Sequence, residues 1–311
     1  MRTVSLLPSA TEVVAALGAE RQLVGRSHRC NYPARITDRP NVTANRDETT
    51  DETDPAAIDA VVDDHRHGNG SYFRVNPSIL ADTDPELILT QHLCEVCAIP
   101  ESMTVDALEQ LDTAPELVSV APTTIEGIID SIERIGVALD RERSANTVIG
   151  TLTDRIERVQ SNLPDGSNPP RIVCLEWTDP VRAHGLWIPD ILDTLGVDDP
   201  FGTPGEPGRE IEWKAVCDYD PDVLVVSPCG RTLSQIEADM DHLVRRPGWE
   251  SLTAVEQDRV FLLDGELSSR HGPRVIRALE LIASVLYPAA FPEITPTTAE
   301  MRPALSAETS H

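Results

Sequence analysis

The opening stretch Thr3-Val4-Ser5-Leu6-Leu7-Pro8-Ser9-Ala10-Thr11-Glu12 decides the fold. Its first five residues form an apolar run of strand length, and Pro8 then begins a helical pattern that stops at Gly18. Ser9 and Glu12 have the spacing of a capping box, and glycine commonly follows the end of a helix. A strand followed at once by a helix is typical of the first unit of a parallel β/α protein.

Further units of the same kind follow along the chain. Apolar runs predict strands at 23–25, 86–90, 117–120, 171–175, 223–226 and 260–263, and helical patterns lie at 55–65, 102–111, 188–195, 233–245 and 273–286. Residues 123–163 keep helical spacing without a strand signal, so we expect two consecutive helices there, the later one spanning between lobes. The sequence therefore predicts an α/β protein with two Rossmann-like lobes, 1–122 and 164–290, whose parallel sheets are joined by bridging helices at 123–163. We expect residues 291–311, rich in Pro, Thr, Ser and Glu, to be a disordered tail.

Two short internal matches favour two similar lobes over one large sheet. The stretch Asp84-Pro85-Glu86-Leu87-Ile88-Leu89 is similar to Asp220-Pro221-Asp222-Val223-Leu224-Val225, and each leads into an apolar run. A helix that ends in Leu-Gly follows the first strand of each half, at Leu17-Gly18 and Leu195-Gly196. Self-similarity of this kind indicates a duplicated unit.

The charge of the chain excludes some partners. It has 52 acidic and 26 basic residues, a formal net charge of −26. Nucleic-acid binding is driven by Lys and Arg that replace counterions on phosphates, so nucleic acid is not expected as a partner. We interpret the dispersed acid as a surface adapted to high salt, where like charges repel one another only weakly.

The N-terminus shows no signal-peptide pattern, and no apolar stretch is long enough to insert into a membrane. As written, the chain is expected to be cytoplasmic, or extracytoplasmic if the true start lies upstream. In the cytoplasm the cysteines should be thiols or metal ligands rather than disulfides.

Ligands of open α/β sheets bind beyond the carboxyl ends of the strands, so the loops after the strands hold the candidate site. Four of the six cysteines fall in these loops. The candidate ligand-binding residues are Pro8, Glu12, His28, Cys30, Tyr32, Gln91, Cys94, Trp177, Trp187, Gly208, Cys229 and Glu266. No catalytic residue is expected.

Several of these candidates have a second interpretation. Cys30, Cys94 and Cys97 could hold zinc or iron, but a single Cys-x-x-Cys pair alone is weak evidence for a metal. Glu12 could be a helix cap instead of a binding carboxylate. Trp177 and Trp187 could contact a flat ligand or pack a helix on a sheet, and both alternatives stay open.

The opening stretch, Asp84-Pro85-Glu86-Leu87-Ile88, Pro247-Gly248-Trp249 and Gly272-Pro273-Arg274 resemble the cobalamin-binding branch of the helical-backbone, or class III, substrate-binding proteins. These proteins serve ABC importers of cobalamin, haem and iron-siderophores. The resemblance covers roughly residues 1–288.

Three loop segments, 27–33, 93–98 and 174–177, resemble a subgroup without a signal peptide that is described as cobalamin-binding. The resemblance implies two lobes bridged by a rigid helix, with the ligand in the cleft between them. Carried over by position, the ligand contacts fall near Pro8, Gln91, Trp177, Gly208 and Glu266. Relatives that dock on a permease present a glutamate on each lobe, and the nearest positions here are Glu95 or Cys97, and Lys214.

We therefore expect non-catalytic, reversible binding of a corrinoid such as cobalamin, in an ABC-type uptake system or a cytoplasmic relative of one, with an ABC permease as a candidate partner. An iron-siderophore or haem is the second candidate ligand. The clustered thiols suggest an alternative of another class, a metal-site or thiol-redox enzyme acting on a corrinoid or tetrapyrrole. The sequence has no nucleophile elbow or P-loop motif, which disfavours other enzyme classes.

Overall fold

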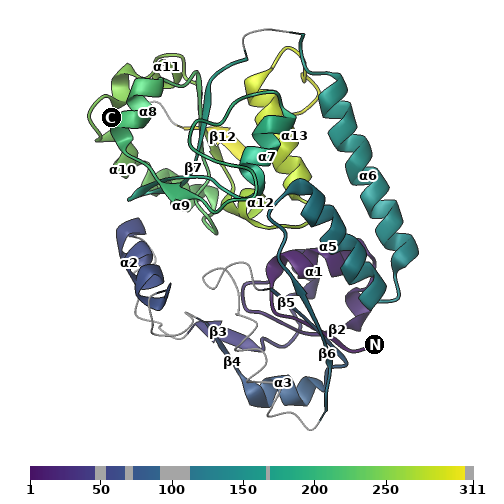
Figure 1. Ribbon diagram of the computed structural model, residues 1–311. Coiled ribbons are helices and arrows are strands. Elements are labelled where there is room, and N and C mark those ends of the chain that lie inside the picture. Colours follow the sequence, from purple (N-terminus) through teal and green to yellow (C-terminus); the bar gives the residue numbers. More distant parts are fainter. Residues whose placement is uncertain (46–53, 67–72, 92–112, 166–168, 305–311) are drawn as a thin grey trace.

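The computed structural model describes residues 1–45, 54–66, 73–91, 113–165 and 169–304. Two sheets, each covered by helices, form two lobes, with the long helices α5 (Ile125–Ala138) and α6 (Glu142–Ser161) along one side of the molecule (Figure 1). The predicted α/β architecture is confirmed. The exact lobe boundaries stay a prediction.

The first sheet is parallel throughout, with strand order β2-β1-β5-β6. Its strands are β1 (Thr3–Ser5), β2 (Leu23–Arg26), β5 (Leu87–Gln91) and β6 (Glu116–Val120). Every residue of β5 is buried, as expected for a strand inside a parallel sheet with both faces covered. A separate antiparallel pair, β3 (Thr43–Asn45) and β4 (Phe73–Val75), lies beside this sheet (Figure 1).

The second sheet has a parallel centre and antiparallel edges, in the order β12-β11-β10-β7-β8-β9. Its strands are β7 (Ile172–Thr178), β8 (Val181–Ala183), β9 (Arg209–Glu210), β10 (Val223–Val226), β11 (Val260–Leu263) and β12 (Met301–Pro303). The edge strands differ from the expected purely parallel sheet. A two-residue turn joins β7 to β8, and so short a connection permits only antiparallel pairing.

The predicted disordered tail, 291–311, is wrong for residues 291–304. Strand β12 pairs with β11, and Phe291 is buried. Arg277 binds Glu300 through two hydrogen bonds of 3.0 Å. A Pro-rich stretch does not have the pattern of a strand, so this strand was not predicted. Edge strands nevertheless tolerate proline, because one side of the strand needs no hydrogen-bond partner. Residues 305–311 lie outside the described ranges.

The helices include those predicted within the described ranges, and residues 233–245 form two short helices. The helices other than α5 and α6 are α1 (Pro8–Ala16), α2 (Pro55–Arg66), α3 (Pro77–Thr83), α7 (Trp187–Thr194), α8 (Trp213–Tyr219), α9 (Leu233–Asp239), α10 (Asp241–Val244), α11 (Thr253–Glu256), α12 (Gly265–Ser269) and α13 (Val275–Leu286). Four of these short helices, α3, α8, α11 and α12, were not predicted. The helix predicted at 102–111 lies outside the described residues. No described helix combines the length and apolarity needed to cross a bilayer.

The repeated Asp-Pro motifs have the same local structure in both lobes. Asp84 ends α3 and Asp220 ends α8, and each adopts a left-handed conformation with φ of 41° and 50°. Asp is one of the few non-glycine residues that adopt this conformation at low cost. The following proline then directs the chain into β5 or β10.

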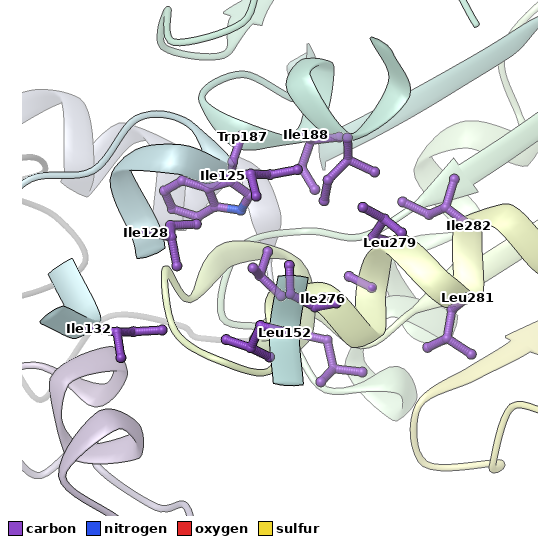
Figure 2. Packing of buried hydrophobic residues seen from close by; sticks show 14 of the residues in the cluster. Ile125, Ile128, Ile132, Leu152, Trp187, Ile188, Ile276, Leu279, Leu281 and Ile282 are labelled. Atoms are coloured by element: carbon purple, nitrogen blue, oxygen red, sulfur yellow. The ribbon is translucent and has the colours of Figure 1, made fainter. Parts of the chain in front are cut away.

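Helix α5 connects the two lobes through one apolar stripe. It packs on α1 of the first lobe and on α7 of the second. The sequence predicted that the later of the two helices, α6, spans between the lobes, but α5 contacts both lobes as well. Figure 2 shows Trp187 and Ile188 of α7 beside Ile125 and Ile128 of α5. The same buried cluster continues through both lobes, so they share a core.

The close approach of α5 and α6 generates a stability prediction. A Cβ on Gly136 would lie 2.5 Å from the Cβ of Ala145. We expect Gly136→Ala to destabilise the protein by about 1–3 kcal/mol through overpacking, although alanine favours helix formation. Gly150 of α6 is exposed, with open space where its Cβ would lie, so Gly150→Ala should stabilise by about 1 kcal/mol. Urea denaturation of both variants checks this, and equal stability of the two would refute the contact.

Candidate functional site

The carboxyl ends of the two sheets face each other, and the loops that leave them meet between the lobes. Asn31, in the loop after β2, donates from Nδ2 to Glu266 after β11 at 2.7 Å. Gln91, the last residue of β5, lies 3.2 Å from the ring of His271. The structure therefore brings together several of the predicted residues, although they come from different halves of the sequence.

Glu12 is the centre of a buried ion cluster between the lobes. We call Glu12, Glu266, Arg270 and Arg274 the inter-lobe ion cluster. Arg270 donates to Oε1 of Glu12 at 3.0 Å, and Arg274 donates to both carboxylate oxygens at 2.7 and 2.9 Å. The Glu12 side chain is only 2% exposed. Both guanidinium groups come from the second lobe, so this carboxylate joins the lobes.

The predicted capping box of Ser9 and Glu12 is wrong. Helix α1 has Leu7 at its N-cap position and no side-chain cap, because Pro8 is already the first helical residue and Ser9 lies inside the helix. Pro8 is half-buried at the sheet edge. Glu12 is therefore neither a cap nor a carboxylate left open for a ligand.

Glu266 and Tyr32 lie at the rim of the inter-lobe ion cluster. Glu266 pairs with Arg270 at 2.6 Å and lies 3.9 Å from Arg274. Tyr32 is exposed, and the Arg274 guanidinium lies 4.1 Å from its ring centroid, a cation–π distance. These two predicted ligand residues thus contribute to contact between the lobes.

His271 forms a second contact between the lobes. Its Nε2 lies 3.2 Å from Ser9 Oγ and 3.2 Å from Gln91 Oε1, both in the first lobe. Burial lowers the pKa of His271 to about 4, so the imidazole is neutral at neutral pH. Gln91 is buried here and does not provide an open surface for a ligand.

Trp177 contacts the first lobe from the opposite side. Its indole Nε1 donates to the carbonyl oxygen of Pro55, at the start of α2, at 3.2 Å. Arg182 of β8 pairs with Asp59 of the same helix at 3.2 Å. Figure 1 shows α2 on the far side of the molecule from α6. Trp177 thus holds α2 against the second lobe.

Trp187 is a packing residue. It is buried in the core, its Nε1 hydrogen-bonds to the carbonyl oxygen of Ser268, and its ring lies against His271 and α5 (Figure 2). The structure shows the packing alternative, and a ligand contact by Trp187 stays a prediction.

Cys30 is not available as a ligand or metal contact. It is fully buried, its Sγ lies 3.0 Å from the hydroxyl of Thr11, and burial raises its pKa to about 11. The described residues include no group of three His, Cys, Asp or Glu side chains that could hold a metal ion. Cys94 and Cys97 lie outside the described residues. Cys229 is partly buried next to β7, where its N–H donates to the Glu176 carbonyl at 3.3 Å.

His28 lines a cavity of about 390 Å³ beside the β3–β4 pair. Its Nδ1 lies 2.7 Å from Thr43 Oγ1, and its Nε2 lies 2.8 Å from Asn45 Oδ1. Arg74 and two asparagines add further polar groups to the lining. Both ring nitrogens of His28 therefore have partners within the first lobe.

Gly208 makes room for a neighbouring carboxylate. A Cβ at this position would lie 2.5 Å from the carboxyl atoms of Glu176. The glycine-rich loop does approach another group closely, as expected, but in the structure this group is a side chain of the same lobe.

Sequence reasoning missed Arg270 and His271 and assigned no role to Arg274. A signal was present, since Arg270 follows Glu266 by four residues and Gly272-Pro273-Arg274 resembles a family motif. Glu12, the partner of Arg270 and Arg274, lies more than 250 residues away from both, and no local pattern predicts a pairing over that separation.

The buried histidines give a pH prediction. Burial lowers the pKa of His184 and of His271 from 6.5 to about 4. The folded state favours the neutral form, so the contribution to stability is complete above pH 6.5 and is lost as the pH falls towards 4. At about pH 4, each histidine should therefore have lowered the free energy of unfolding by about 3 kcal/mol.

Urea denaturation at pH 7.0, 5.5 and 4.5 tests this expectation. The variant His271→Gln should show a smaller loss of unfolding free energy over this range than the unmodified protein. An unchanged pH dependence in the variant would mean that His271 does not titrate as inferred.

Comparisons with known proteins agree with this architecture. A sequence model of the family described as "Periplasmic binding protein" matches residues 4–267. The uncharacterized ABC transporter substrate-binding lipoprotein YvrC of Bacillus subtilis (strain 168) is 32% identical over 80 residues, which are 26% of this chain and 23% of that protein. The match thus spans about a quarter of the curated relative's length.

Solved structures share the fold at low sequence identity. The periplasmic haem-binding protein RhuT from Roseiflexus sp. RS-1 has a TM-score of 0.69 at 21% identity, covering 93% of this chain and 98% of that one. The periplasmic vitamin B12-binding protein BtuF of Vibrio cholerae has a TM-score of 0.67 at 19% identity, covering 93% and 97%. Because the family model covers most of the residues and the two-lobed fold agrees with it, this chain belongs to the periplasmic binding protein family.

Proposed function

We propose that this protein reversibly binds a corrinoid, cobalamin or a close relative, between its two lobes. It would act as the substrate-binding component of an ABC-type uptake system or as a cytoplasmic relative of one. One observation carries the proposal: the carboxyl ends of both sheets face each other, as the contacts of Glu12 and Gln91 across the lobes show. Ligands of open α/β sheets bind at this edge.

His28, His271 and Cys30 provide no open axial ligand for haem iron. Haem iron is commonly held by an axial imidazole or thiolate from the protein. His28 has partners on both ring nitrogens, His271 lies between Ser9 and Gln91, and Cys30 is fully buried. A corrinoid that keeps its own axial ligands needs no such group, so contacts to its ring and side chains are sufficient.

A thiol-redox enzyme receives less support from the described cysteines. The nucleophile in thiol chemistry is the thiolate. Burial raises the pKa of Cys30 to about 11 and the pKa of Cys174 well above its ordinary value. Both groups therefore remain protonated and inert at neutral pH.

A permease partner belongs to the same proposal. Lys214, which stands near the position of a docking glutamate in related proteins, is exposed on α8 and pairs with Asp218. The position is accessible on the outer surface of the second lobe. An importer that docks at this position would meet a lysine where related proteins present a glutamate.

Titration of the purified protein with cyanocobalamin in high salt tests the proposal. We expect a shifted visible spectrum of the ligand and a Kd that is micromolar or tighter. Haem and a ferric siderophore, titrated in parallel, serve as competing ligands. Absence of cobalamin binding at millimolar concentration, or clearly tighter binding of haem, would contradict the proposal.

A further inference from the structure

The cavity beside the β3–β4 pair is separate from the edge where the two lobes meet. Its volume is about 390 Å³, within the usual range of small-molecule sites. All eight residues that line it lie between positions 28 and 79, in the loops after β2, on β3 and β4 and at the start of α3 (Figure 1). A ligand in this cavity would therefore be held by the first lobe alone.

Arg74 supplies a positive charge to the lining of this cavity. It stands opposite Ala44 in the β3–β4 pair, and its Nε donates to the carbonyl oxygen of Asn45 at 3.4 Å. Other arginines of this lobe pair with carboxylates, whereas Arg74 forms no ion pair with any residue that the structure describes. Its two terminal nitrogens therefore remain to bind two oxygens of an anion, the geometry in which arginine binds carboxylate and phosphate groups.

Two asparagines add amide N–H donors to the same lining. Asn45 Oδ1 lies 2.8 Å from Nε2 of His28. Asn76 Oδ1 accepts from the backbone N–H of Ile79 at 3.3 Å, and so caps α3. Both amide oxygens are thus engaged within the protein. The amide nitrogens remain, and each carries two N–H donors.

The lining contains no acidic side chain, although the chain as a whole is strongly acidic. It has 52 Asp and Glu residues and a formal net charge of −26, whereas none of the eight described residues around the cavity is Asp or Glu. Most of this protein surface therefore repels anions. A guanidinium group with amide donors beside it, and without a carboxylate in the same lining, makes this cavity a local exception.

We propose that this cavity binds the carboxylate or phosphate group of a small organic molecule. Arg74 binds two oxygens of the anion, and the amide nitrogens of Asn45 and Asn76 donate to it. A volume of about 390 Å³ leaves room for a carbon skeleton as well as the oxyanion, and Ala44 and Ile79 provide an apolar wall for that skeleton. This second site is independent of corrinoid binding between the lobes.

The test compares four hexoses that share a ring and differ in charge. Glucuronate carries a carboxylate, glucose 6-phosphate carries a phosphate, glucose is neutral and glucosamine is a cation. Isothermal titration calorimetry at constant ionic strength would give the Kd of each. Both anions should bind at least tenfold more tightly than glucose, because hydrogen bonds to a charged group are the stronger ones. Glucosamine should bind most weakly, since Arg74 repels it.

Two variants change the lining, and a third serves as the matched control. Arg74→Gln should weaken binding of both anions at least tenfold. Asn76→Asp keeps the cap of α3, because Asp and Asn are equally good at this position, but replaces donors by a negative charge and should abolish the preference for anions. The control Arg21→Gln should leave binding unchanged. Arg21 is exposed in the turn that precedes β2, at the other end of this strand from His28.

Thermal melting shows that each variant is folded, and the binding data then decide. Whichever anion binds more tightly identifies the carboxylate or the phosphate as the preferred group, and either result supports the site. Equal binding of glucose and the anions, or tighter binding of glucosamine, would overturn the proposed anion chemistry. An effect of Arg21→Gln as large as that of Arg74→Gln, or no binding of any of the four hexoses, would overturn the site itself.

Discussion

Both lobes depend on the apolar stripe of α5, which is buried against α1 on one side and α7 on the other. Ile125, Ile128, Ile132 and Ile135 recur at helical spacing and belong to one core that extends into both lobes. Burial of apolar surface is the main favourable term in folding. A relative movement of the lobes would expose part of this core, so the two sheet edges stay opposite each other.

This constraint makes the inter-lobe ion cluster feasible. A carboxylate as deeply buried as Glu12 is stable only when its partners are fixed in good geometry, and two arginines of the second lobe bind both of its oxygens. The cluster and His271 close the side near α1, and Trp177 with α2 closes the other side. The lobes are thus joined on both sides of the edge where a ligand would bind.

Among the residues that the structure describes, the polar chemistry of this edge comes more from carboxylates, guanidinium groups and imidazoles than from thiols. Cys30 is buried as a small apolar residue, a common role for free cysteine. The Glu176 carboxylate lies against Gly208 and 3.7 Å from the His184 ring. A family in which many ligands share one fold achieves selectivity through such local groups, since the fold alone does not specify the ligand.

The sequence by itself determined the parallel strands at the centres of both sheets and the longer described helices, because hydrophobic periodicity and the Asp-Pro and Leu-Gly stops are local signals. The short edge strands and short helices were not predicted, because they carry little periodicity of their own. It also placed Glu12, Gln91, Trp177 and Glu266 at strand ends that the fold brings near the other lobe. Only the tertiary structure decided their partners. Glu12 meets Arg270 and Arg274, and Trp177 meets Pro55, across more than 100 residues of chain. Pairing over such separations depends on how the lobes pack, which no local pattern encodes.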